Sequence, residues 1–284
     1  MSRFQRSSTP GQDANASTEP IGHPPQPPVV GTTEGLDQYR LRLPRLLSTR
    51  PGGGAGLFHG EVAGRADIRA ATLRGLDKGH RGMEGQDAAA AAWDSEVITV
   101  AVADGVSSHG PPSGDAAEIA AHTAAEAALH HSFEEAISLA ADAIRDESCS
   151  GRTTLVLARI HVPGPAAQIG WSAELAAIGD SEAWLLRDSA FLLLLSQPGF
   201  DNVTAALPDQ IHFASANVPL ESKDVLFLAS DGFASALTDT GSSLRSTLAV
   251  EWTRPPPLLT FASQVNFQLE GHFDDRTVIA VWLR

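Results

Sequence analysis

The sequence predicts an α+β protein built from antiparallel sheets. Two observations lead to this prediction. Strand-like segments outnumber helical segments, and they follow one another in runs instead of alternating with helices. The chain has 284 residues, of which 43% are hydrophobic, which is enough for one large hydrophobic core. No internal repeat divides the chain.

The local patterns define the expected elements. The predicted strands cover residues 66–75, the run that ends at Asp104, 153–161, 168–179, 182–188, 190–195, 224–230 and 277–283. The predicted helices cover 114–131, 133–146, 233–238 and 258–270. Asp115 is the expected N-cap of the first helix, and Asp188-Ser189 suits a hairpin turn. Polar loops are expected over 76–86 and 196–222.

The N-terminal segment has a different composition. Residues 1–36 are rich in Ser, Thr, Pro, Gly and Gln and contain one aromatic residue, Phe4, so they cannot bury enough apolar surface to fold. Residues 37–48 have the apolar spacing of a short amphipathic helix, which Pro44 interrupts. The glycines of residues 50–56 indicate a linker. We therefore expect a tail and linker over 1–56 and a folded domain over 57–284.

Charge and cysteine content exclude several classes of protein. The net charge is −14, and residues 56–284 hold 14 basic and 30 acidic residues, which argues against nucleic acid as a partner. No apolar run reaches the roughly 20 residues of a membrane span. The polar N-terminus lacks the pattern of a signal peptide. The single cysteine, Cys149, excludes a disulfide framework, so we expect a cytoplasmic protein.

Acidic side chains recur where strands meet loops. One strand ends in Asp104, a later strand ends at Asp231, and the last strand begins after Asp274. If these ends face the same edge of a sheet, the carboxylates converge and cannot all stay ionised without compensation. Divalent cations are the usual compensation, and oxygen-only ligands favour Mg²⁺ or Mn²⁺. Asp87 is a candidate fourth member of this cluster.

The order of these segments resembles a known family. The matching segments are Gly85-Gln86-Asp87, Val102-Ala103-Asp104-Gly105 with His109-Gly110 and Gly114-Asp115, Gly151-Arg152-Thr153-Thr154-Leu155, Gly179-Asp180-Ser181-Glu182, Ser230-Asp231-Gly232 and Asp274-Asp275-Arg276-Thr277-Val278. They resemble the metal-dependent Ser/Thr protein phosphatases of type 2C, the PPM family, in its bacterial form. The match spans residues 66–284.

The resemblance implies a fold and a metal centre. The fold would be a four-layer αββα sandwich of two antiparallel sheets flanked by helices. Two Mn²⁺ or Mg²⁺ ions would lie at one end, the first held by Asp104, Asp231 and Asp274. Asp104 would bridge to the second ion, aided by the Gly105 carbonyl and, through water, by Asp87. A water between the two ions would attack phosphorus in line, without a covalent phospho-enzyme.

The resemblance also implies the substrate class. The protein would hydrolyse phosphoserine and phosphothreonine in a phosphorylated protein, such as the target of a Ser/Thr kinase. We expect a monomer with no nucleic-acid or membrane partner.

The sequence departs from the family pattern around the substrate site. Members usually have an Arg five residues before the early Asp; Gly82 occupies that position, and Arg81 is the candidate phosphate ligand. Val106 follows Asp-Gly where eukaryotic members have His, so His109 is the candidate for protonating the leaving oxygen. A solvated loop residue is the alternative in both cases. Ser107-Ser108 replaces the usual Gly-Gly.

Two other functions are compatible with parts of the sequence. A catalytically weak or inactive relative could act as a regulatory binding module, and the loss of a metal Asp would favour it. Asp104, Asp231 and Asp274 are all present. A serine esterase is the second alternative, because Gly179-Asp180-Ser181 resembles a Gly-Asp-Ser block, although the late Asp-x-x-His of those enzymes is missing.

Overall fold

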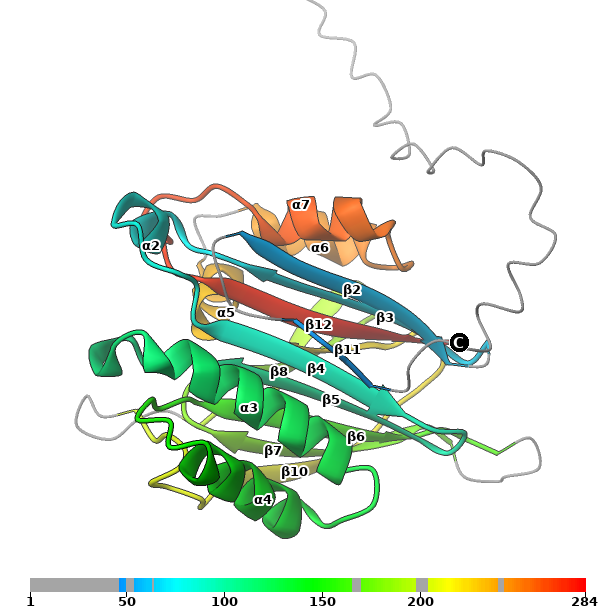
Figure 1. The fold of residues 1–284 in the computed structure, drawn as a ribbon. Coiled ribbons are helices and arrows are strands. Elements are labelled where there is room, and N and C mark those ends of the chain that lie inside the picture. Colours follow the sequence, from blue (N-terminus) through cyan, green and yellow to red (C-terminus); the bar gives the residue numbers. More distant parts are fainter. Residues whose placement is uncertain (1–45, 50–53, 63, 165–169, 198–203, 240–242) are drawn as a thin grey trace, which may run out of the picture.

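A computed structural model describes residues 46–49, 54–62, 64–164, 170–197, 204–239 and 243–284. Two antiparallel six-stranded sheets lie face to face, and helices cover the outer face of each sheet (Figure 1). The predicted four-layer αββα sandwich is therefore confirmed. In the described part of the chain, no helix is both long and apolar enough to cross a membrane.

The first sheet has the strand order β1-β4-β5-β6-β7-β10. Its strands are β1 (Leu46–Ser48), β4 (Asp87–Trp93), β5 (Val97–Asp104), β6 (Leu155–His161), β7 (Ser172–Ile178) and β10 (Ala214–Pro219). The second sheet has the order β2-β3-β12-β11-β8-β9. Its strands are β2 (Ala55–Val62), β3 (Ala66–Leu73), β12 (Arg276–Leu283), β11 (Val225–Ala229), β8 (Glu182–Arg187) and β9 (Ala190–Leu195). The last strand thus lies in the middle of its sheet.

Alternation along each strand separates the layers. On β5, Ile98, Val100 and Val102 point into the core between the two sheets, whereas Ala101 and Ala103 point toward the helices. The side chains of a strand project alternately to its two faces, so the larger residues fill the space between the sheets. The small residues let the helices approach the sheet closely.

Helices α3 (Pro112–Ala127) and α4 (Phe133–Asp146) cover the first sheet (Figure 1). Alanines along α3, such as Ala120, meet the alanines of β4 in a buried layer. Helix α4 begins with a capping box, in which the Glu135 N–H donates to Ser132 Oγ and the Ser132 N–H donates to the Glu135 carboxylate. The box satisfies two backbone donors of the first turn.

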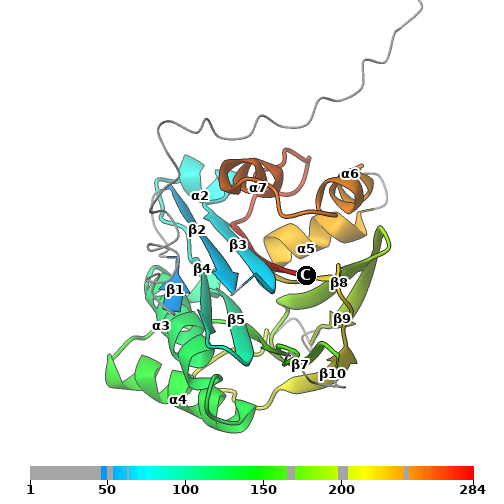
Figure 2. The same ribbon diagram turned by 90° about the vertical axis from the view of Figure 1, so that its right-hand side faces the viewer.

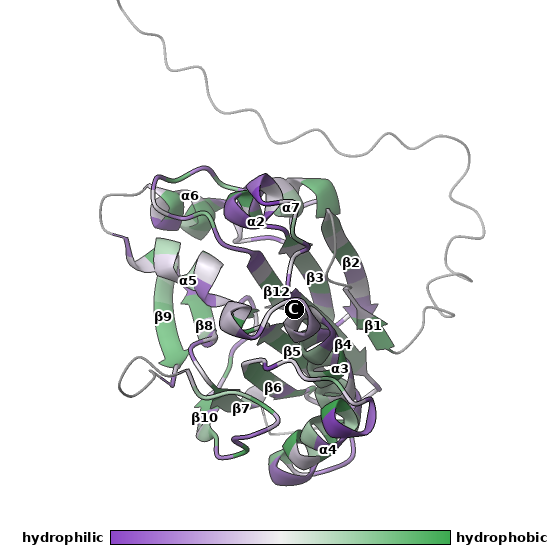
Figure 3. Cartoon of the chain, turned by 60° about the vertical axis from the view of Figure 1, so that its left-hand side comes forward, coloured by the Kyte–Doolittle hydropathy of each residue, from purple (hydrophilic) through white to green (hydrophobic). Residues whose placement is uncertain are grey.

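Helices α5 (Asp231–Thr238), α6 (Leu244–Glu251) and α7 (Leu258–Val265) cover the second sheet (Figure 2). This layer is aromatic. The fully buried Trp252 contacts the rings of Phe227, Phe233, Phe261 and Trp282. Hydrophilic residues concentrate on loops and on outward helix surfaces, as Figure 3 shows for α4. The short helix α2 (Leu76–His80) lies at one end of the sandwich.

Several elements differ from the sequence-based expectation. Helix α3 begins at Pro112, so Asp115 lies in its first turn and is not its N-cap. Helix α2 lies in the expected loop over 76–86, helix α6 was not expected, and β10 lies in the expected loop over 196–222. The sequence of β10, Ala-Ser-Ala-Asn-Val-Pro, is weak in β-forming residues, and its place at the sheet edge allows a terminal Pro219.

The N-terminal boundary also differs. The domain start expected at residue 57 falls inside β2, and Leu46–Ser48 pair with β4 instead of continuing a helix over 37–48. A three-residue strand is too short to show periodicity, and it forms because β4 supplies the hydrogen-bonding edge. The rest of the expected tail and linker, residues 1–45 and 50–53, lies outside the described residues.

The alanine layer gives a first prediction. We expect Ala120→Leu to lower the free energy of unfolding by about 1–3 kcal/mol, because a larger side chain cannot fit between α3 and the first sheet. Glu126→Leu, at an exposed position of the same helix, should change it by less than about 0.5 kcal/mol. Urea denaturation measures both. Equal effects would contradict close packing at this interface.

Candidate metal centre

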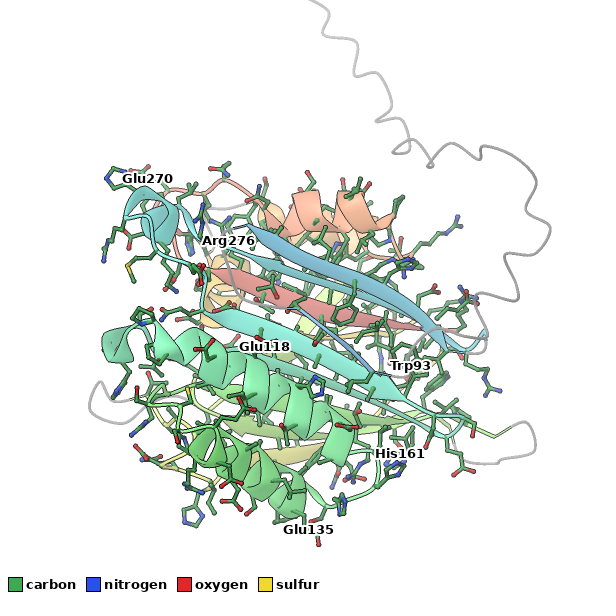
Figure 4. The ribbon with its side chains drawn as sticks, viewed as in Figure 1. Trp93, Glu118, Glu135, His161, Glu270 and Arg276 are labelled. Carbon is green, nitrogen blue, oxygen red and sulfur yellow. The ribbon has the colours of Figure 1, made fainter. Side chains whose placement is uncertain are left out.

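The first sheet brings two aspartates together. Asp87 is the first residue of β4 and Asp104 is the last residue of β5, and the antiparallel register pairs them directly. Figure 4 helps to locate this end, because Trp93 closes β4 at the opposite end of the sandwich. Local sequence explains the arrangement, since a short turn folds β4 and β5 into a hairpin whose outer ends must meet.

The second sheet supplies the other carboxylates. Strand β11 ends at Ala229, and Asp231 begins helix α5 directly after it. Strand β12 begins at Arg276, labelled in Figure 4, after Asp274 and Asp275. Antiparallel pairing of Ala229 with Val278 puts the end of one strand beside the beginning of the other. The Thr277 N–H donates to Ser230 Oγ at 2.9 Å and locks this junction.

The carboxyl groups from the two sheets are close enough to influence one another. Burial, followed by the charges of Asp87, Asp231 and Asp274, raises the pKa of Asp104 well above its usual value. Burial, followed by the charge of Asp180, raises the pKa of Asp231, although solvent reaches the Asp231 side chain. The four aspartates that the sequence singled out therefore form one cluster at one end of the sandwich.

Asp87 is the most deeply buried member. It has no exposed surface, and neither of its carboxylate oxygens has a hydrogen-bond partner among the described residues. Burial, and then the charge of Asp275, raises the pKa of Asp87 to about 8, while Lys78 and then the Ser230 hydroxyl, which lies nearby without hydrogen-bonding geometry, act in the opposite direction. A buried carboxylate without a partner is costly in any protein, so this position favours a cation.

One lysine contacts the cluster. Lys78 Nζ donates to Asp275 Oδ2 at 2.7 Å and to Asp274 Oδ1 at 3.2 Å. Asp275 also accepts hydrogen bonds from the backbone N–H groups of Gly75 and Gln86, each at 2.6 Å. Burial alone would lower the pKa of Lys78, but Asp275 and then Asp274 raise it, so the ammonium stays charged.

Two glycines allow the close backbone packing around the cluster. A Cβ atom at Gly232 would lie 2.0 Å from the Asp275 carbonyl oxygen, and one at Gly105 would lie 2.6 Å from the Ser113 carbonyl oxygen. No side chain fits at these separations. Both glycines directly follow an aspartate of the cluster, so their role in packing explains the repeated Asp-Gly pairs.

The donor set fits divalent cations. In the described part of the chain, however, no three Asp, Glu, His or Cys side chains are arranged so that they could hold a metal ion as they stand. The unpartnered oxygens of Asp87 and the neighbouring carboxyls of Asp104 and Asp231 are nevertheless oxygen donors of the kind that Mg²⁺ and Mn²⁺ prefer. A bound cation would neutralise the excess negative charge at this end of the sandwich.

Among the described residues, the other two candidates, Arg81 and His109, form no hydrogen bond or ion pair with the four aspartates. Arg81 forms an ion pair with Asp77 at 2.7 Å, and its side chain is 61% exposed. His109 lies on the 3-10 turn Ser107–His109 and is exposed. The basic group that acts on the cluster is instead Lys78, two positions into α2. A single lysine in a polar loop has no sequence pattern that could have identified it.

The turn between β7 and β8, which carries the chain from the first sheet to the second, adds two acidic groups. The negative charge of Asp180 raises the pKa of Asp231, and the negative charges of Asp180 and Asp231 raise that of Glu182 after the larger effect of burial. Glu182 accepts a hydrogen bond from the Trp184 indole at 2.8 Å. Ser181 is completely buried and hydrogen bonds to Thr154 Oγ1, so it cannot serve as an esterase nucleophile.

Comparison with known proteins identifies the family. Residues 74–255, more than half of the chain, match the family model of protein phosphatase 2C. The chain belongs to the protein phosphatase 2C family. The match to the family model ends before Asp274 and β12. The structure nevertheless places both beside Asp231. No curated protein sequence matches the chain.

Solved structures share the fold. RsbX in complex with magnesium aligns with a TM-score of 0.57 and 15% identity, over 80% of this chain and 100% of RsbX. The Mycobacterium tuberculosis serine/threonine phosphatase PstP aligns with a TM-score of 0.53 and 18% identity, over 78% and 99% of the two chains. The PstP catalytic domain with two manganese ions gives 0.54 and 17%, over 77% and 98%. These likenesses concern the phosphatase 2C fold.

The buried carboxylate gives a pH prediction. The pKa of Asp87 is raised in the fold from 3.8 to about 8, so its protonated form is favoured by folding. Its contribution to stability is full below about pH 4 and is lost as the pH rises toward about 8. In a metal chelator, Asp87→Asn should therefore be more stable than the wild type at about pH 8, by more than about 1 kcal/mol.

Urea denaturation of both proteins across this pH range measures the difference. The gap should shrink as the pH falls toward about 4, because the unfolded carboxyl then begins to take up the proton that the folded one already holds. A pH-independent difference would show that Asp87 does not hold a proton in the folded state.

The close approach at Gly232 gives another prediction. We expect Gly232→Ala to lower the free energy of unfolding by at least about 2 kcal/mol, because the new methyl group would overlap the Asp275 carbonyl oxygen. Gly170→Ala is the matched control, since no atom lies within 4 Å of a Cβ there. Thermal unfolding compares the two. Similar melting temperatures would contradict tight packing between α5 and the start of β12.

Proposed function

We propose that this protein is a metal-dependent phosphoprotein phosphatase that hydrolyses phosphoserine and phosphothreonine monoesters. The observation that supports it most directly is the convergence of Asp87, Asp104 and Asp231 from two sheets, with Asp87 buried and unpartnered. Family membership supports the reaction class, and a similar solved structure, PstP, is described with two manganese ions.

The residues divide into distinct roles in this proposal. Asp104, Asp231 and Asp274 would hold one Mn²⁺ or Mg²⁺ ion, and Asp104, the Gly105 carbonyl and Asp87 would hold a second. When bound, the two ions supply activation of water and neutralisation of charge on the phosphoryl group. Asp87 is fully buried, whereas the more exposed Asp231 and Asp274 lie on the side that a substrate can reach.

Arg81, the candidate ligand for the substrate phosphate, is not held in place by contacts with the metal centre. Arg81 is exposed and paired with Asp77, so it would have to leave this ion pair to contact a phosphate. Exposed ion pairs are worth only about 0–1 kcal/mol, so that exchange is inexpensive. His109 is exposed near the end of β5 and would protonate the leaving oxygen if the bound substrate lies within hydrogen-bond reach.

The biological setting is part of the same proposal. The substrate would be a phosphorylated protein, such as a Ser/Thr kinase target, and the protein would act as a cytoplasmic monomer. The single cysteine suits a reducing compartment. The net charge of −14 disfavours nucleic acid as a competing ligand.

A regulatory module with weak or no catalysis is the second candidate. The exposed, self-paired Arg81 favours it, because the family position for the phosphate-binding arginine is Gly82. Such a protein would bind a phosphorylated partner without turning it over.

One substitution tests catalysis at the cluster. We expect Asp231→Asn to reduce Mn²⁺-dependent hydrolysis of p-nitrophenyl phosphate and of a phosphothreonine peptide by at least about 100-fold, because it removes an anionic ligand. Asp188→Asn, at an exposed turn with a positive φ that Asn tolerates, should keep full activity. Chelation should abolish wild-type activity and Mn²⁺ should restore it.

The outcomes separate the candidates. Chelator-insensitive hydrolysis, or wild-type turnover by Asp231→Asn, would refute the metal-dependent mechanism. Phosphopeptide binding without turnover in any metal would favour the regulatory module.

A further inference from the structure

Lys78 is unusual in this chain. The sequence holds 20 basic residues, of which only Lys78 and Lys223 are lysines. Lys78 lies on α2 with 6% of its side chain exposed, whereas Lys223 is exposed. A lysine is almost never buried unless its charge is paired, so the burial of Lys78 depends on its ion-pair partners.

Lys78 contacts two aspartates that directly precede β12 at the end of the second sheet. Lys78 Nζ lies 2.7 Å from Asp275 Oδ2, and both side chains are buried. It also lies 3.2 Å from Asp274 Oδ1, which accepts a second hydrogen bond from the Asp275 N–H at 2.8 Å. One oxygen of Asp274 is therefore already bound by two donors. The remaining oxygen, Oδ2, is the atom available to a metal ion.

These contacts suggest a role beyond packing. We propose that Lys78 is a built-in counter-cation of the metal centre, which shares the Asp274 carboxylate with a divalent cation and so weakens the affinity of the site for metal. This inference rests on the proposed function, because it assumes that Asp274 is a metal ligand.

The physical basis is charge and ligand sharing. A metal ion on Asp274 would share a carboxylate with an ammonium group, so the two positive charges would repel each other in a partly desolvated site. Lys78 would also reduce the negative charge that attracts the cation, because its charge acts on Asp87 as well as on Asp274. Both effects lower metal affinity.

The same contact stabilises the protein before metal binds. Asp275 is 2% exposed and receives Lys78 and two backbone N–H groups, which connects α2 and the start of β4 to β12. Without Lys78, a buried carboxylate would lose its counter-charge. Lysine suits this role because its compact ammonium can reach two carboxylates from one point, whereas the larger planar guanidinium of Arg prefers a bidentate partner.

Calorimetric titration of Mn²⁺ into chelator-stripped protein at a fixed neutral pH tests the inference. We expect Lys78→Met to bind Mn²⁺ at least about tenfold more tightly than the wild type, which corresponds to about 1.4 kcal/mol. Lys78→Gln, which keeps a hydrogen-bond donor but no charge, should show the same direction and guards against misfolding of Lys78→Met. Lys78→Arg keeps the charge and should remain within about threefold of the wild type.

Lys223→Met is the matched control, because it removes the other lysine. Lys223 precedes β11 and Asp231 follows it, so the five residues of β11, roughly 16 Å at about 3.3 Å per residue, separate the two. Its Mn²⁺ affinity should equal that of the wild type. Thermal unfolding gives a second readout: metal-free Lys78→Met should melt below the wild type, and saturating Mn²⁺ should raise its melting temperature more.

The results distinguish the inference from the proposed function. Equal or weaker Mn²⁺ binding by both Lys78→Met and Lys78→Gln, with a wild type that binds Mn²⁺ and hydrolyses phosphopeptide, would overturn the role of Lys78 alone. No Mn²⁺ binding by any variant would overturn the metal centre and this inference together. Tighter binding by Lys223→Met as well would reduce the effect to overall charge and would also overturn it.

Discussion

The carboxylates at one end of the sandwich repel one another, and the surrounding fold must compensate for this repulsion. Asp87 and Asp104 come from one sheet, and Asp231 and Asp274 come from the other. Like charges held this close raise one another's pKa and must be protonated or paired with cations. Two stacked sheets can hold them there because the apolar core between the sheets offsets the electrostatic cost.

The glycines and the lysine show how the fold meets this constraint. Gly105 and Gly232 let neighbouring backbone segments approach within distances that no side chain allows. Asp275 has its charge met by Lys78 and by two backbone donors, so it is a satisfied buried group beside the cluster. Asp87 is the opposite case, a buried carboxylate without a partner among the described residues. Asp275 and Asp87 thus differ in whether their negative charge is compensated, because their contacts differ.

The substrate side of the site is less constrained than the metal side. Arg81 and His109 lie on exposed segments, and the arginine already has a carboxylate partner. Ser107 hydrogen bonds to the Gln86 side chain, which also donates to the Gly110 carbonyl oxygen. The loop after β5 is therefore tied to the residue that precedes Asp87. Changes in this loop, where the sequence departs from the family pattern, can reach the metal centre through these hydrogen bonds.

Local periodicity and short motifs were enough to predict the fold class, the helix over Phe133–Asp146, the strands around each Asp-Gly pair and the candidate ligands. The pairing of β1 and β10 could not be predicted in this way, because weak edge strands form only where a neighbouring strand offers hydrogen bonds. Only the tertiary structure decided that Lys78 faces Asp274 and Asp275. Those contacts span almost 200 residues of sequence, and no local pattern specifies which cation a folded chain brings to a carboxylate.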